Sequence, residues 1–195
     1  METLVLATRN PGKIAELQEM LAPLNITVKS ALDLNLPDVP EDTGTFEGNA
    51  AQKAEAASKA TGLPVLADDS GLCVDALGGE PGVETAHYGG WKNLLPALKN
   101  IPESHRGAHF VCVMAYAAPG EPIKYFKGRI FGRIATEARG EGGFGFDPVF
   151  IPDGYEHTFA ELGAEVKNPI SHRGQALQSF VDHVMNPQKQ IVRER

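Results

Sequence analysis

Strands and helices are expected to alternate over the N-terminal third of the chain, a pattern typical of α/β folds. Apolar runs mark two of the strands, Thr3 to Ala7 and Leu63 to Ala67, which are suited to burial within a sheet. The other expected elements here are a helix carrying Ile14, Leu17 and Leu21, a strand near Ile26 to Lys29, a loop from Asp33 to Asp42, and a helix from Phe46 to Ala60 between Thr45 and Gly62. We therefore expect a sheet flanked by helices.

The remainder of the chain predicts antiparallel pairing. Strand patterns from Ala108 to Ala117 and from Tyr125 to Ile134 flank the turn Pro119-Gly120, as in a hairpin. The second strand alternates, and one of its faces carries Tyr125, Lys127, Arg129, Phe131 and Arg133. The other expected elements are a loop from Gly78 to Gly82, a helix from Leu94 to Ile101, a strand from Pro148 to Ile151, a helix from Arg173 to Val184 and a polar tail from Asn186 to Arg195.

The size and charge of the chain narrow its functional classes. Its 195 residues suffice for one domain of two lobes, with the apolar and charged fractions of a globular protein. A net charge of −7 argues against nucleic-acid binding but allows a small anionic ligand. The run at Leu4 is too short for a membrane span or a secretory signal, and Cys73 and Cys112 are expected to be reduced thiols, so we expect a cytoplasmic protein.

Two carboxylates and a hydroxyl, in Asp68-Asp69-Ser70-Gly71, follow the run Leu63 to Ala67 where its strand is expected to end. Ligands of open α/β sheets sit at strand ends, and a carboxylate pair there suits Mg²⁺ and the activation of a water. A tight turn explains the same residues. A second site is indicated by Glu41-Asp42-Thr43-Gly44, with Asn49 and Lys53 a little further on, and Glu41 supplies a further carboxylate for the same ion. The alternative is that the segment is only a solvated acidic loop.

A phosphate-binding segment is indicated by Thr8-Arg9-Asn10-Pro11-Gly12-Lys13, which opens a helix with hydroxyl, amide, backbone N–H and ammonium groups. The helix dipole and the unpaired N–H groups favour phosphate at such a position. Simple capping of the helix, beside a surface lysine, is the alternative. The segment is not a Walker A loop, because Ala7 and Ile14 stand where that pattern has Gly and Ser or Thr.

The segment Gly140 to Gly145 matches the dinucleotide pattern G-x-G-x-x-G, but Asp147-Pro148 prevents a helix after it, so it is no Rossmann fingerprint. We interpret it as a loop in which Phe144 or Phe146 stacks on a base and Asp147 makes a polar contact. The alternative is that the aromatic rings only pack inward.

A group of donors surrounds the start of the last predicted helix, with Lys167 just before Ile170-Ser171-His172-Arg173. These side chains suit the carbonyl edge of a purine. Alternatively, Ser171 caps the helix and the cations are exposed. A serine hydrolase is disfavoured, because no G-x-S-x-G elbow surrounds Ser70.

Taken in order, five segments make the chain resemble the inosine/xanthosine triphosphate pyrophosphatase family, the Ham1-like enzymes that clear non-standard purine nucleotides. The segments are Ala7 to Lys13, Glu41 to Phe46, Ala67 to Leu72, Gly142 to Pro148 and Ile170 to Arg173. The resemblance implies an elongated, two-lobed α/β fold of the Ham1/Maf-like kind, with a mixed sheet flanked by helices and a nucleotide cleft between the lobes. It also implies a homodimer and Mg²⁺-dependent hydrolysis of ITP, dITP and XTP to the monophosphate and pyrophosphate.

The resemblance also implies roles for individual residues. Glu41 and Asp69 would bind Mg²⁺, and Asp69 would act as the base for a water that attacks the α-phosphorus. Thr8 to Lys13 would hold the triphosphate, and Ser70 would touch the substrate. The nucleoside would be enclosed and read by Phe144, Gly145, Phe146, Asp147, Lys167, His172 and Arg173. Donors to O6 favour hypoxanthine and xanthine over adenine, whose amino group leaves such donors unpaired.

Two other functions stay open at this point. One is a related pyrophosphatase that prefers dTTP or UTP, and the other is a non-catalytic sensor that binds a triphosphate without cleaving it. Asp69 together with Glu41 favours hydrolysis, because a sensor has no need to activate water. The chain departs from the family pattern at Gly48, at His87, at Phe146 and in the short segment 89–94.

Overall fold

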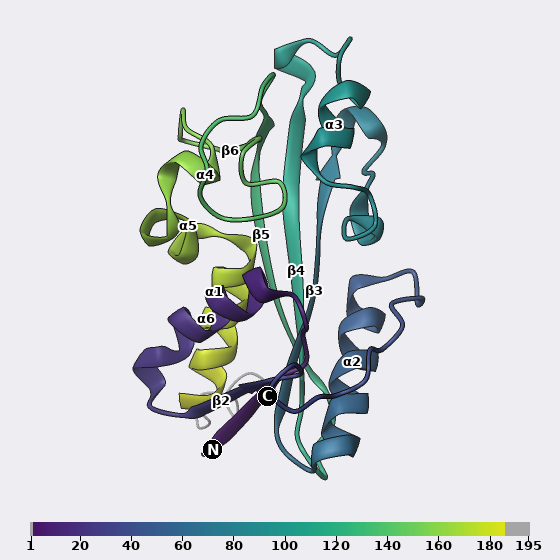
Figure 1. Cartoon of the computed structure of the whole chain (residues 1–195), viewed down its shortest axis with the longest axis vertical. Coiled ribbons are helices and arrows are strands. Elements are labelled where there is room, and N and C mark those ends of the chain that lie inside the picture. Colours follow the sequence, from purple (N-terminus) through teal and green to yellow (C-terminus); the bar gives the residue numbers. More distant parts are fainter. Residues whose placement is uncertain (1, 186–195) are drawn as a thin grey trace, which may run out of the picture.

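A mixed sheet runs the length of an elongated molecule in the computed structural model, which describes residues 2–185 (Figure 1). The strand order among these residues is β2-β1-β3-β4-β5-β6. The strands are β1 (Thr3–Leu6), β2 (Thr27–Ser30), β3 (Val65–Val74), β4 (Gly107–Ala117), β5 (Lys124–Ile134) and β6 (Phe150–Pro152). Strand β1 pairs parallel with β2 and β3, and the pairs from β3 to β6 are antiparallel, which confirms the predicted mixed sheet. The tail predicted from Asn186 to Arg195 lies outside the described residues.

The helices of the described residues are α1 (Pro11–Leu21), α2 (Phe46–Thr61), α3 (Trp91–Ala97), α4 (Phe159–Leu162), α5 (Ala164–Ile170) and α6 (His172–Met185). Both predicted ends of α2 are confirmed. The Thr45 hydroxyl accepts a hydrogen bond from the backbone N–H of Gly48 at 3.1 Å, and Gly62 ends the helix in the left-handed region with φ of 66°. Helix α3 begins three residues before the predicted Leu94, and α4 and α5 were not predicted.

Helices cover both faces of the sheet at the end of the molecule that holds the short strands β1 and β2 (Figure 1). On one face α1 and α6 contribute Leu17, Leu21, Leu177 and Phe180 to a core with Leu66 and Met114. On the other face α2 packs through Ala50, Ala54 and Ala57 against Ala67 and Ala115. Because these contacts are made by small side chains, α2 lies close to the strands.

The sequence predicted that the strand before Asp68 ends there, and this prediction is wrong. Strand β3 continues to Val74 and pairs with β4 throughout, with Asp68 opposite Met114 and Asp69 opposite Val113. The strand that ends at this level is β1, which pairs with β3 only at Val65 and Leu66. The ligand-binding edge expected at a strand end is therefore created by β1, and Asp69 faces it from within a longer strand.

Among residues 2–185, no helix combines the length and the apolar character that crossing a membrane requires.

Candidate active site

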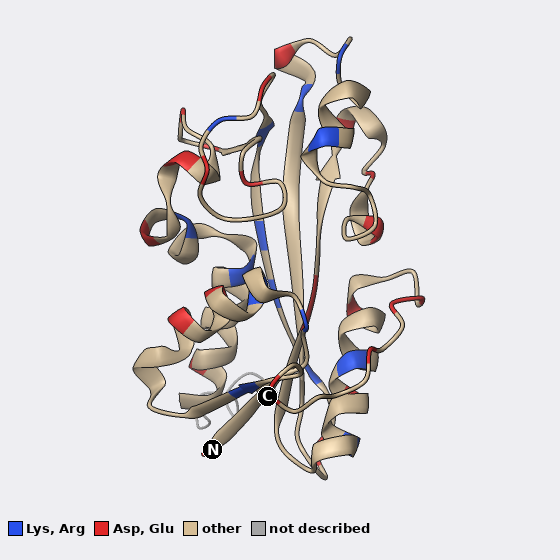
Figure 2. Cartoon of the chain, in the orientation of Figure 1, with Lys and Arg blue, Asp and Glu red and all other residues tan. Residues whose placement is uncertain are grey.

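A cavity of about 440 Å³ lies beside the middle of β3, near the end of β1. Figure 2 shows acidic residues at mid-length on β3 and basic residues on the elements around it. All five segments singled out in the sequence reach this cavity. The predicted residues that line it are Thr8, Arg9, Asn10, Lys13, Glu41, Asp69, Ser70, Phe144, Gly145, Phe146, Asp147, Lys167, His172 and Arg173.

The segment that begins α1 is a capped helix start. The Asn10 side chain accepts hydrogen bonds from the backbone N–H groups of Gly12 at 2.9 Å and Lys13 at 3.2 Å. Pro11 occupies the first helical position, where its missing N–H leaves no bond unmade. Pro11 and Gly12 do not line the cavity, so the segment offers a phosphate the ammonium of Lys13 and the polar groups of Thr8 to Asn10.

Gly12 instead allows the loop that carries Phe144 to close onto α1. A Cβ atom on Gly12 would lie 2.6 Å from the Phe144 ring, so the contact requires glycine. The same ring has the ammonium of Lys167 at 5.0 Å and the guanidinium of Arg173 at 5.7 Å from its centre. Phe146 borders the cavity but is 5 % exposed and belongs to the core, as the inward-packing alternative predicted for one of the rings.

Asp69 is a buried carboxylate with a defined orientation. One of its oxygens accepts a hydrogen bond from the side-chain amide of Asn49, and the other accepts one from the Ser70 N–H, both at 2.9 Å. Burial raises the pKa of Asp69 to about 6, and the charge of Glu41 adds to this, while Lys53 and Asn49 act in the opposite direction. A carboxylate with a pKa near neutrality suits a general base.

Two residues of α2 connect the Glu41 loop with β3. The Lys53 ammonium lies 3.1 Å from a Glu41 oxygen and donates to the Asp68 carbonyl at 2.7 Å. The Asn49 side-chain oxygen accepts hydrogen bonds from the backbone N–H and the hydroxyl of Thr43 at 3.1 and 2.8 Å. The sequence placed Asn49 and Lys53 near the acidic loop without a role of their own. Their spacing of four residues, which puts both on one helix face, was the available signal.

Glu41 and Asp69 fit Mg²⁺ as a partial set of ligands. Among residues 2–185, no group of three or more His, Cys, Asp and Glu side chains is arranged to hold a metal ion. Mg²⁺ in nucleotide enzymes uses one or two carboxylates and completes its shell with waters and phosphate oxygens. A cation would also relieve the repulsion that Glu41 exerts on Asp69. The pair therefore suits an ion that binds together with a polyphosphate, and not a metal centre completed by the protein.

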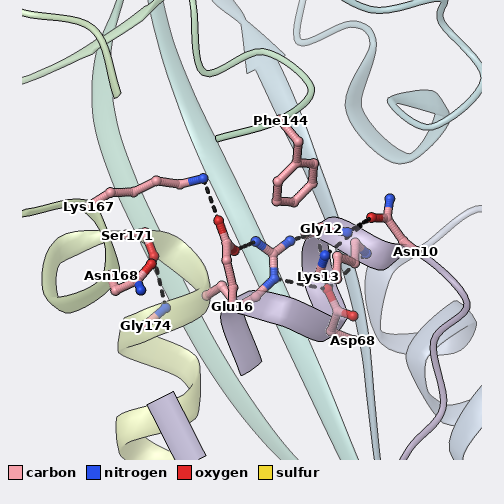
Figure 3. A network of polar contacts seen from close by, with 12 residues as sticks. Asn10, Gly12, Lys13, Glu16, Asp68, Phe144, Lys167, Asn168, Ser171 and Gly174 are labelled. Carbon is pink, nitrogen blue, oxygen red and sulfur yellow. Dashed lines mark hydrogen bonds and ion pairs between the residues drawn. The ribbon is translucent and has the colours of Figure 1, made fainter. Parts of the chain in front are cut away.

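Another part of the cavity borders a buried network of alternating charges (Figure 3). Glu16 of α1 places one oxygen 2.6 Å from the Lys167 ammonium and the other 2.6 Å from the Arg173 guanidinium. Lys167 also lies 2.6 Å from Asp147, whose carboxylate accepts the backbone N–H of Phe144 at 2.9 Å. The sequence did not identify Glu16, because no local motif marks a carboxylate that bridges two distant cations.

His172 also lines this part of the cavity. Its ring is 4 % exposed and stacks on Phe110, with 4.6 Å between ring centres and an interplanar angle of 10°. Burial, with the positive charges of Arg173 and Lys167, lowers the pKa of His172 well below its ordinary value, so the imidazole is neutral at pH 7. A neutral imidazole offers one N–H donor and one acceptor nitrogen.

The start of α6 is capped by Ser171, but its neighbouring cations are buried. The Ser171 hydroxyl accepts the N–H of Gly174 at 3.0 Å, which confirms the predicted cap. Lys167 and Arg173 are only 4 % and 2 % exposed, so the alternative of solvent-exposed cations is wrong. The hydroxyl of Ser70 contacts Arg173 and Asp68, and not a histidine, which agrees with the rejection of a serine hydrolase.

Comparison with known proteins identifies relatives that are similar to this chain over most of its length. The family model described as the Ham1 family matches residues 4–183. A dITP/XTP pyrophosphatase of Streptomyces avermitilis is 46% identical over 192 residues, which cover 93% of this chain and 96% of the relative. A dITP/XTP pyrophosphatase of Bacillus subtilis is 46% identical over 189 residues, covering 92% and 96%.

Solved structures give the same picture of the fold. A HAM1 protein from Coxiella burnetii superposes with a TM-score of 0.84 at 40% identity, over 95% of this chain and 100% of that one. The Ham1 protein of Staphylococcus aureus has a TM-score of 0.82 at 38% identity, with the same coverage.

Proposed function

The chain belongs to the Ham1 family, and on that premise we propose that it hydrolyses non-standard purine nucleoside triphosphates such as ITP, dITP and XTP. The products are the nucleoside monophosphate and pyrophosphate. One observation carries the proposal: buried donors of Lys167, His172 and Arg173 line the same cavity as Lys13, Asp69 and the polar groups of Thr8 to Asn10. A base requires donors of the first kind, and a polyphosphate requires groups of the second kind.

At the polyphosphate end, Lys13 and the polar groups of Thr8 to Asn10 hold the triphosphate. Mg²⁺, when bound by Glu41 and Asp69, would supply charge neutralisation at the phosphate oxygens. Asp69, oriented by Asn49, positions and deprotonates the water that attacks the α-phosphorus. Positioning and charge neutralisation supply most of the acceleration in reactions of this kind.

At the base end, Lys167, His172 and Arg173 donate to the 6-oxo edge of the purine, and the Phe144 ring covers the base. Glu16 and Asp147 hold the two cations in place before substrate binds. Adenine presents an amino group at position 6, which would leave these buried donors unpaired, and the site discriminates against it for that reason. Guanine shares O6 with hypoxanthine, so its rejection has to arise at position 2.

We further propose that the protein acts as a homodimer in the cytoplasm. Support for a dimer comes from Tyr125 and Phe131, which are 46 % and 54 % exposed and lie on the same face of β5. Aromatic side chains are enriched at protein interfaces relative to the rest of the surface. Cys73 and Cys112 are free thiols, as expected in a reducing compartment.

A panel of triphosphates with and without Mg²⁺ tests the activity, with pyrophosphate and orthophosphate measured separately. We expect Mg²⁺-dependent release of pyrophosphate from ITP, dITP and XTP, and much slower release from ATP and GTP. Faster turnover of dTTP or UTP would indicate another base preference. Tight binding of ITP without release of pyrophosphate would indicate a sensor.

The Asp69→Asn variant tests the assigned base. It preserves the shape of the side chain and removes the proton acceptor, so we expect turnover of ITP to fall by about a hundredfold or more. A folded Asp69→Asn protein with near-normal turnover would remove Asp69 from the mechanism.

A further inference from the structure

Asp68 precedes Asp69 on β3 and points to the opposite face of the sheet, since successive side chains of a strand alternate. Its side chain is 1 % exposed and does not line the cavity. Asp68 is therefore not placed to touch a substrate, and any effect that it has on the reaction must pass through its neighbours.

Its neighbours are cations from two helices (Figure 3). One Asp68 oxygen lies 2.9 Å from the ammonium of Lys13 on α1 and 3.6 Å from the guanidinium Nε of Arg173 on α6. The same oxygen accepts the Ser70 hydroxyl at 3.3 Å, and that hydroxyl accepts an Arg173 N–H at 3.0 Å. Asp68 thus contacts both Lys13, which is proposed to hold the triphosphate, and Arg173, which is proposed to read the base.

The two cations depend on Asp68 unequally. Arg173 has a second carboxylate, Glu16, at 2.6 Å, whereas Asp68 is the one acid within ion-pair distance of Lys13 among residues 2–185. One oxygen of Asp68 thus lies within 4 Å of both cations and forms an ion pair with each of them.

We propose that Asp68 is a positioning residue that acts through Lys13 and holds its ammonium beside Arg173, so that the polyphosphate and base ends of the cavity keep a fixed relation. The inference rests on the proposed function, because it requires Lys13 to meet the triphosphate. Without the carboxylate, Lys13 and Arg173 repel each other, and the flexible lysine turns toward the bound phosphates in another position.

The charge of Asp68 has two opposing effects on the reaction. A negative charge near a polyanion weakens ground-state binding, while the fixed position of Lys13 favours the transition state. Removing the charge should therefore separate affinity from turnover. A group with a purely structural role would instead lower affinity and turnover together, or lower only the fraction of active protein.

The first experiment compares the wild type with Asp68→Asn. Affinity for inorganic tripolyphosphate is measured by calorimetry, whose stoichiometry gives the folded fraction, and kcat is measured with ITP. We expect at least twofold tighter tripolyphosphate binding, a lower KM and a kcat lower by about 10- to 100-fold, the scale of a misplaced reacting group. A kcat within twofold of the wild type, or a joint loss of kcat and affinity, would overturn the inference. Asp75→Asn, on an acid outside the cavity, is the matched control and should leave both quantities unchanged.

A double-mutant cycle with Lys13→Met tests whether Asp68 acts through Lys13. In the Lys13→Met background, Asp68→Asn should change kcat by less than twofold, whereas equal losses in both backgrounds would contradict the proposed route.

If Asp68→Asn does not fold, Asp68→Ala prepared with formate takes its place, and failure of formate to restore kcat in the folded variant counts against the inference. Wild-type protein that releases no pyrophosphate overturns the proposed function and this inference with it. Active wild type beside a normal Asp68→Asn overturns this inference alone.

Discussion

His172 is enclosed by the ring of Phe110 and by the cations Arg173 and Lys167. A positive imidazole there would lose its hydration and meet two like charges, so the folded protein keeps it neutral. The neutral ring can present a single N–H to the base without adding a third positive charge to this end of the cavity. The same environment links His172 to the pH dependence of stability.

We predict that His172 makes the protein less stable as the pH falls below about 6.5. In the unfolded chain the imidazole takes up a proton near its ordinary pKa, while the folded protein resists protonation until much lower pH. The free energy of unfolding therefore decreases with falling pH, by up to about 1.4 kcal/mol per pH unit from this residue. Urea unfolding of the wild type and of His172→Gln at about six pH values from 7.5 to 5 measures the difference between their free energies of unfolding.

The comparison with the variant isolates His172 from Asp69, which acts with the opposite sign. The pKa of Asp69 is raised to about 6, so its contribution favours the folded state as the pH falls below that value. If wild type and His172→Gln show equal pH slopes, His172 is charged in the folded protein and its assignment here is wrong.

At the scale of residues, the sequence identified side chains that carry their own local motif. Thr8 to Asn10, Lys13, Asp69 and Arg173 stand in such motifs, and the cavity brings them together. Glu16 was missed because its meaning lies in partners 151 and 157 positions away, which no local pattern contains. Asn49 was noticed only as a neighbour of the acidic loop, because its bond to Asp69 exists only once α2 lies on β3.

At the scale of elements, the course of β3 depends on a close approach at Gly71. A Cβ atom there would lie 2.1 Å from the backbone oxygen of Gly82, and the Thr85 hydroxyl accepts the N–H of Leu72 at 2.9 Å. The segment 82–85 therefore docks directly on β3 beside Asp69 and Ser70. Thr85 lines the same cavity, so this contact also shapes the site.

We predict that Gly71→Ala destabilises the protein by about 1–3 kcal/mol, because the added methyl group meets backbone that cannot rotate away. Chemical unfolding gives the change in the free energy of unfolding. Cys73→Ala, two residues along on the same face of the strand, is the control and should change it by less than about 1 kcal/mol. A Gly71→Ala protein as stable as the control would show that the approach of segment 82–85 is not required.

Elements with strong periodicity or caps were predicted, and elements governed by tertiary contacts were not. Asp68 to Gly71 is composed of turn-forming residues, yet it stays extended because β4 pairs with it and because Lys13 and Asn49 each bind one of its two carboxylates. Helix α4 had a readable signal, since Thr158 and Glu161 form a capping box. Helix α5 is short and contains Pro169, so neither length nor propensity distinguished it from a loop.

At the scale of the whole molecule, the outer face of β5 is the surface that the proposed dimer would cover. Phe131 contacts His109, with 5.3 Å between ring centres, and the Arg129 guanidinium lies 5.8 Å from the Phe131 ring. We predict that Phe131→Glu shifts sedimentation from a dimer to a monomer, because a charge would be buried at the centre of the interface. Lys59→Glu, on α2 away from this face, serves as the control, and an unchanged dimer in Phe131→Glu would place the interface elsewhere.

The long strands β3, β4 and β5 run the length of the molecule (Figure 1), and the cavity beside β3 brings together the groups proposed to hold the base and the triphosphate. The proposed reaction requires that water attack the phosphorus nearest the nucleoside, because its products are the monophosphate and pyrophosphate. Hydrolysis of ITP with Mg²⁺ in water enriched in heavy oxygen, followed by mass spectrometry of the products, tests this directly. We expect the label in the inosine monophosphate and none in pyrophosphate, and label in pyrophosphate or in orthophosphate would contradict attack at the α-phosphorus.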